Sequence, residues 1–217
     1  MTASSPPPLL TLPLFPLGTV LFPGGLLPLR IFEVRYLDMI GRCHKAGLPF
    51  GVVGLTQGAE VRVPGAEAER FAGVGTLATI SQLASPLPGL MNIECVGTRR
   101  FRIRSSEQHK HGLWTAEVEP LPDDVPLPVP DDLQHTTAAL QRLVRTLEER
   151  KAQTDAAVRL PVQPPYHFDD CGWVANRWCE LLPLQPELKQ RLMELDGPLM
   201  RLELVSDLLA RTGIAKG

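Results

Sequence analysis

The chain has 217 residues, of which 44% are hydrophobic and 21% are charged, and its formal net charge is −2. This composition can bury a core, which excludes an intrinsically disordered protein, and the weak charge gives no general field that attracts nucleic acid or anionic membranes. No apolar run approaches the about 20 residues of a membrane helix, and residues 1–8 lack the basic start of a secretory signal. We therefore expect a soluble, cytoplasmic protein with a flexible tail at residues 1–8.

Proline recurs through residues 12–36 and excludes a long helix across their first half, because each proline removes a backbone donor. We expect short extended segments there, with a bend at residues 22–25. Prolines in strands favour sheet edges or strand starts. After Pro28 the apolar period becomes helical, which predicts an amphipathic helix that ends at Gly47. The residues expected on its apolar face are Phe32, Tyr36, Ile40 and Cys43, and those expected to face elsewhere are Glu33, Arg35, Asp38, Arg42 and Lys45.

Short apolar and alternating segments then predict a mainly antiparallel β domain. The expected strands are residues 50–55, 60–63, 74–80, 91–96, 99–104 and 114–118. Residues 64–70 are expected to form a loop, and Gly97-Thr98 is expected to turn a hairpin. Gly75 lies inside a strand and indicates a bulge or a close approach of backbone.

Five prolines and two acidic residues in 120–130 predict a semi-rigid spacer. Beyond it, helical periodicity predicts four helices. Asp131 or Asp132 is expected to cap the first helix, and Asp169 or Asp170 the second. Pro186 and Pro198 fit the first turns of the last two helices, where their missing amides would be unpaired anyway.

Several of these segments resemble the Lon amino-terminal domain, the substrate-recognition domain of Lon proteases, which also occurs as a separate protein. The matching segments are Leu12-Pro13-Leu14-Phe15-Pro16-Leu17, Leu21-Phe22-Pro23-Gly24, Leu29-Arg30-Ile31-Phe32-Glu33, Arg35-Tyr36, Phe50-Gly51-Val52-Val53, Val74-Gly75-Thr76-Leu77-Ala78 and Arg100-Phe101-Arg102-Ile103. Trp173-Val174-Ala175-Asn176 and residues 196–204 resemble the helical half of that domain. The family usually has proline where this chain has Val34.

The resemblance implies an α+β fold, a PUA-like β pseudo-barrel followed by a C-terminal α-helical bundle. We expect the barrel domain with its one helix at residues 9–121, a proline-rich linker at 122–130 and the helical domain at 131–213.

The sequence offers no catalytic motif, so we expect no enzyme and no cofactor. No phosphate-binding Gly-x-x-x-x-Gly-Lys-Ser/Thr motif occurs. Asp196-Gly197-Pro198 is similar to part of the Lon peptidase site, but Leu199 stands at the nucleophile position and has no hydroxyl. A structural zinc site needs about four ligands at good geometry. Neither His109 with His111 nor His167 with Asp169, Asp170 and Cys171 is expected to form such a site. We expect no metal, and four cysteines that are reduced and buried.

Arg100, Arg102 and Arg104 alternate with Phe101 and Ile103 and are expected to share one outward face of a strand. PUA-like barrels include RNA-binding proteins, so an RNA-binding module is an alternative function. A basic stripe normally occurs in a basic domain with stacking aromatic residues, whereas this chain is slightly acidic and 6% aromatic. We therefore expect arginines that are solvated or paired with acids.

The function that the resemblance implies is non-catalytic binding of unfolded or partner polypeptides, as an adaptor or regulator. An enzyme or small-molecule binder with an unrecognised cleft is the other alternative, and weak self-association is left open. We expect the binding surface between barrel and helices, although core packing is an alternative role for Phe32, Tyr36 and Trp173. The candidate residues are Arg30, Phe32, Glu33, Tyr36, Trp173, Asn176 and Arg177.

Overall fold

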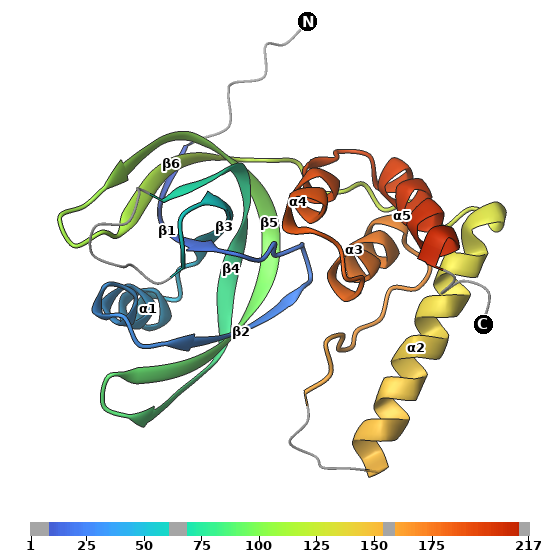
Figure 1. Ribbon diagram of the computed structural model, residues 1–217, viewed down its shortest axis with the longest axis horizontal. Coiled ribbons are helices and arrows are strands. Elements are labelled where there is room, and N and C mark those ends of the chain that lie inside the picture. Colours follow the sequence, from blue (N-terminus) through green and yellow to red (C-terminus); the bar gives the residue numbers. More distant parts are fainter. Residues whose placement is uncertain (1–8, 61–68, 154–158, 213–217) are drawn as a thin grey trace, which may run out of the picture. The chain divides into compact units, whose positions relative to one another are not determined.

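The computed structural model describes residues 9–60, 69–153 and 159–212, and it divides the chain into two compact units, Met1–Asp123 and Asp124–Gly217. The expected tail at residues 1–8 and most of the expected strand at 60–63 and loop at 64–70 lie outside the described residues. The units are coloured along the sequence in Figure 1.

The first unit is a six-stranded sheet with one helix among its described residues (Figure 1). Its elements are β1 (Leu10–Leu17), β2 (Leu26–Ile31), α1 (Val34–Ala46), β3 (Phe50–Gln57), β4 (Arg70–Leu87), β5 (Leu90–Gln108) and β6 (Trp114–Pro120). The strand order is β2-β5-β4-β3-β1-β6, and a further pairing between β5 and β6 closes five of the strands into a ring. The expected β pseudo-barrel and the α+β class are therefore confirmed.

Strand β1 carries two prolines although it lies inside the sheet. It pairs with β6 through residues 10–14 and with β3 through residues 14–17, so each half has one partner strand. Pro13 lies in the half that pairs with β6, and Pro16 lies in the half that pairs with β3. Because each half has one side without a partner strand, a proline, which has no amide hydrogen to donate, can be accommodated there. The prediction that prolines lie in edge strands is confirmed for β2, which contains Pro28 and pairs only with β5 among the described residues.

The predicted hairpin at Gly97-Thr98 is wrong. Strand β5 runs without a break through both residues, and the turn that joins β4 to β5 lies at Pro88-Gly89, where Gly89 has a φ of 75°. The amide of Gly97 donates to the Gly25 oxygen and its carbonyl accepts from the Gly24 amide. The glycine therefore marks a close approach of two chain segments and not a turn.

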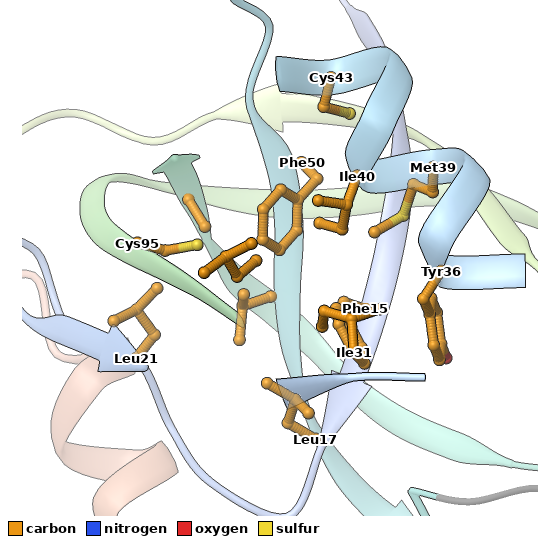
Figure 2. Packing of buried hydrophobic residues seen from close by; sticks show 13 residues of the cluster. Phe15, Leu17, Leu21, Ile31, Tyr36, Met39, Ile40, Cys43, Phe50 and Cys95 are labelled. Atoms are coloured by element: carbon orange, nitrogen blue, oxygen red, sulfur yellow. The ribbon is translucent and has the colours of Figure 1, made fainter. Parts of the chain in front are cut away.

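Helix α1 packs on the sheet through an apolar face that begins one turn later than expected. Figure 2 shows Tyr36, Met39, Ile40 and Cys43 turned towards Phe15 and Phe50. The rings of Phe15 and Tyr36 stack with centroids 3.9 Å apart. The predicted end of the helix is confirmed, because Gly47 adopts the left-handed conformation and its amide donates to carbonyls of the last turn.

Two residues near the start of α1 differ from the expected pattern. Phe32 precedes the helix and is 55% exposed, so it is not part of the core. Arg35 was expected to lie off the apolar face of the helix, but it is buried and only 8% exposed. A charged side chain is buried at this depth only where partners compensate its lost hydration.

The second unit contains four α-helices in its described residues, as predicted (Figure 1). They are α2 (Gln134–Gln153), α3 (Cys171–Leu181), α4 (Pro186–Glu194) and α5 (Pro198–Thr212). Asp170 caps α3 by accepting a hydrogen bond from the Trp173 amide at 2.7 Å, which confirms one of the two predicted caps. Asp131 and Asp132 do not cap α2. They form the 3-10 turn η1 (Asp131–Leu133), which precedes that helix.

The predicted linker at residues 122–130 is hydrogen-bonded in the structure. The Val129 amide donates to the Asp169 oxygen, and the Cys171 amide donates to the Leu127 oxygen. These contacts lie within the second unit, so part of the proline-rich segment packs against the start of α3. The domain limits proposed from the sequence stay predictions. None of the helices in the described part of the chain has the length and apolar character of a membrane span.

The close approach predicted at Gly75 supplies a test of the barrel. A Cβ atom at this position would lie 2.5 Å from the Val52 oxygen, whereas a Cβ at Gly73 would meet nothing within 4 Å. We expect Gly75→Ala to lower the free energy of unfolding by about 1–3 kcal/mol through overpacking. Gly73→Ala should change it by less than about 0.5 kcal/mol. Urea unfolding of both variants measures the difference, and equal midpoints would contradict the packing described here.

Candidate functional site

A groove of about 1000 Å³ runs along α1 in the first unit. One wall is α1 with the residues that flank it, and the other is formed by the turn between β5 and β6 and by the start of β6. The lining residues are Pro13, Phe32, Glu33, Val34, Arg35, Asp38, Met39, Arg42, Cys43, Ala46, Leu48, His109, His111, Leu113 and Thr115. The groove thus combines apolar side chains with charges of both signs.

Three apolar side chains of the groove are open to solvent. Phe32 is 55% exposed, Val34 is 74% exposed and Leu48 is 61% exposed. Single exposed apolar residues are ordinary on protein surfaces, but apolar residues gathered at a concave site indicate a binding surface. Phe32 lies just before α1, Val34 is its first residue, and Leu48 follows its end. We call these three residues the apolar rim.

Arg35 fixes the shape of this groove through three segments of the chain. Its Nη1 donates to the Gly112 oxygen at 2.7 Å, in the turn that precedes β6. Its Nε donates to Glu33 Oε2 and its Nη2 to Glu69 Oε1, both at 3.1 Å. Glu69 also accepts a hydrogen bond from Trp114 Nε1 at 2.9 Å. The two walls of the groove are therefore joined by one buried guanidinium group.

The surroundings of Arg35 keep it charged. Burial lowers the pKa of Arg35, but Tyr36 and the carboxylates of Glu69 and Glu33 raise it by more, and the net pKa is raised. The guanidinium carbon lies 4.5 Å from the centre of the Tyr36 ring. Burial raises the pKa of Tyr36, so its phenol stays neutral at physiological pH. Glu33 forms an ion pair with Arg35, and Glu69 is a second partner.

The other polar groups of the groove do not form a recognisable catalytic or metal-binding set. His109 Nε2 lies 2.8 Å from Thr115 Oγ1, and Arg42 Nε donates to the Asp38 main-chain oxygen at 3.3 Å. No group of three His, Cys, Asp or Glu residues in the described ranges could hold a metal ion. Burial raises the pKa of Cys43, which disfavours a reactive thiolate.

The first unit places its four predicted site residues differently. Phe32 and Glu33 line the groove, whereas Tyr36 is 2% exposed and packs beneath it against Phe15. Arg30 is exposed in β2 and does not line the groove. The structure thus brings two of the four residues together at one concave surface.

The remaining predicted residues belong to α3 of the second unit and have structural partners there. Asn176 is buried and its Oδ1 accepts a hydrogen bond from the buried Arg201 at 2.9 Å. Trp173 packs edge-on against Phe168, with centroids 5.2 Å apart. Arg177 is 3% exposed and forms an ion pair with Glu180 at 2.9 Å. A role of these side chains in binding stays a prediction.

Sequence reasoning missed Val34, Leu48 and the burial of Arg35. The sequence did contain a signal for Val34 and Leu48. Each is an apolar residue at one end of a helix whose buried face is already formed by other apolar residues. Arg35 carried no such signal: its partners Glu69 and Gly112 lie 34 and 77 residues away.

The expected arginine stripe on β5 is only partly correct. Arg102 and Arg104 are exposed, but Arg100 is 4% exposed. Arg104 forms an ion pair with Glu119, and Arg99, next to the stripe, forms one with Asp123. The stripe is thus interrupted at Arg100, and Arg104 is paired with an acid.

The role of Arg35 gives a direct test of stability. We expect Arg35→Met to lower the free energy of unfolding by about 3 kcal/mol, because it leaves two partly buried carboxylates and the buried Gly112 oxygen without their partner. Arg42→Met, on the exposed side of the same helix, should change it by less than about 0.5 kcal/mol. Thermal and urea unfolding measure both variants. Equal stabilities would show that Arg35 does not hold the groove together.

Comparison with known proteins places the chain in a family. Residues 11–211 match the family model described as the ATP-dependent protease La (LON) substrate-binding domain. The crystal structure of a Lon N-terminal domain protein from Xanthomonas campestris is similar, with 30% sequence identity and a TM-score of 0.69, over 93% of this chain and 98% of that one. The comparison with curated proteins gave no significant match.

A second solved structure, the N-terminal domain of a Mycobacterium avium complex Lon protease, shares the fold. It is 19% identical with a TM-score of 0.55, over 91% of this chain and 96% of that one. With the family match across both units, the resemblance found in the sequence is confirmed. The chain belongs to the family of Lon substrate-binding domains.

Proposed function

We propose that this protein binds unfolded or partner polypeptides along the α1 groove and acts as a non-catalytic adaptor or regulator. The observation that carries the proposal is the apolar rim: Phe32, Val34 and Leu48 are exposed around one concave surface. The family is described as a substrate-binding domain, which supports a binding role.

The groove has the composition of a binding surface. Water against the exposed rim is released when an apolar segment covers it, which favours association. Glu33, Asp38 and the histidines offer polar contacts at its sides, and such groups set orientation and register. The groove is also held open by a fixed frame, since Arg35 ties α1 to the turn before β6. Binding then requires little ordering of the protein, which lowers its entropic cost.

An unfolded chain suits this groove better than a compact ligand of one shape. The rim contacts are apolar and therefore tolerant of side-chain identity, as expected for a surface that meets many sequences. Glu33 and Asp38 add a polar preference without a narrow pocket. We assign no role in binding to Tyr36, because it is buried against Phe15.

Two equally exposed leucines allow a matched test of the groove. Leu48 is 61% exposed within the rim, and Leu87 is 62% exposed at the end of β4, outside the groove. We expect Leu48→Glu to weaken binding of reduced, carboxymethylated α-lactalbumin by about 1 kcal/mol or more, since it places a charge among apolar contacts. Leu87→Glu should leave the affinity unchanged. Both variants should have the melting temperature of the wild type, because both side chains are exposed.

The affinities are measured by fluorescence anisotropy with the labelled client. Equal affinities of the two variants would remove the rim from the binding surface. Failure of the wild-type protein to bind this client at any concentration tested would contradict polypeptide recognition itself.

The non-catalytic part of the proposal has its own measurement. We expect purified protein neither to hydrolyse ATP nor to cleave casein, because the sequence holds no phosphate-binding loop and has Leu199 where a peptidase serine would stand. Activity that co-purifies with the protein and disappears in one of its own point variants would contradict this.

A further inference from the structure

We propose that the α1 groove selects apolar segments that carry a basic residue and rejects segments that carry an acidic one. This inference rests on the proposed function and names the chemistry of its client. It follows from the distribution of charge along the groove-facing side of α1.

The buried cation that lines the groove already has two carboxylate partners. Arg35 contacts the carboxylates of both Glu33 and Glu69 at 3.1 Å, so this buried group carries one more negative than positive charge. The side chain of Glu33 is 20% exposed and that of Arg35 is 4% exposed. A client therefore meets the carboxylate side of this pair more readily than the guanidinium.

Asp38 adds a second negative charge, one helical turn beyond Val34. Its carboxylate forms no hydrogen bond or ion pair within residues 9–60, 69–153 and 159–212, and the residue is exposed. Arg42, one turn further on, donates its Nε to the main-chain oxygen of Asp38 and not to the carboxylate. Asp38 is thus available to a cation supplied by the client.

The spacing suits a client with neighbouring apolar and basic side chains. Residues four apart lie side by side on one face of a helix, so Val34 and Asp38 present an apolar contact next to a carboxylate. Lysine and arginine can lay their aliphatic stems along apolar surface while the charged end reaches an acid. An acidic client residue would instead face Asp38 and Glu33 and be repelled.

The other charged groups of the groove do not reverse this preference. Arg42, His109 and His111 also line it, and His109 Nε2 is engaged with Thr115 Oγ1. Lys110 lies in the same turn but is not among the lining residues. Among the lining residues, Glu33 and Asp38 equal Arg35 and Arg42 in number. The excess negative charge comes from Glu69, which does not line the groove but is the second carboxylate partner of Arg35.

The test uses two synthetic 12-residue peptides with the same apolar residues, one with a central lysine and one with a central glutamate. We expect the wild-type protein to bind the lysine peptide about fivefold more tightly, as fits an exposed ion pair and a matching repulsion. Asp38→Asn should bring the two affinities within about twofold, and Asp38→Lys should reverse their order. Raising the salt concentration should reduce the preference.

Asp207→Lys is the matched control, because Asp207 is also an exposed aspartate of a helix but lies in α5 of the second unit. It should keep the wild-type preference. Equal binding of both peptides by the wild type, with both weakened by Leu48→Glu, would overturn the charge preference and leave the groove as the binding site. If neither peptide nor the unfolded client binds, both proposals fail. Tighter binding of the glutamate peptide would also overturn the inference.

Discussion

The groove depends on one buried cation. Burying the Arg35 guanidinium costs hydration energy that only close partners can offset. Here the partners are Glu33, Glu69 and the Gly112 oxygen, which come from three different parts of the chain. Because the cation needs all three to remain buried, it fixes the start of α1, the approach to β4 and the turn before β6 relative to one another. A polar interaction thus holds the walls of the groove, and the apolar side chains nearby need not hold them.

That arrangement explains how apolar residues stay exposed without loss of the fold. The core beneath α1 is complete, since Tyr36, Met39 and Ile40 fill the space against Phe15 and Phe50 (Figure 2). Phe32, Val34 and Leu48 therefore contribute little to packing, and their exposure is available for binding. The carboxylates of Glu33 and Asp38 lie on the same wall. The site combines tolerance for apolar sequence with a preference for charge, which suits a protein that captures many chains but not all of them.

Much of the fold follows from local sequence signals. The end of α1 at Gly47, the Asp170 cap and the start of α4 at Pro186 each depend on residues within one turn, so the sequence predicts them.

The errors arise where segments far apart in the sequence determine the local structure. Gly97 has the composition of a turn, but a Cβ there would lie 2.3 Å from the Phe22 oxygen, so the glycine serves a close approach within a continuous strand. Arg35 has the pattern of a surface residue because periodicity contains no information on Glu69 or Gly112. The groove could be predicted only in small part. Phe32 and Glu33 belong to the family-like opening segment, whereas Leu48 and His109 come to line the same groove only in the folded barrel.

The central claim is that a polypeptide lies along α1, and site-specific photo-crosslinking tests it most directly. Val34 and Val125 are each 74% exposed, the first on the groove and the second in the other unit. Replacing either with a photoreactive benzoylphenylalanine gives two proteins with equally accessible probes. With carboxymethylated α-lactalbumin as client, the account predicts a crosslinked product from position 34 and none from position 125. A bound client that crosslinks from position 125 and not from position 34 would contradict it.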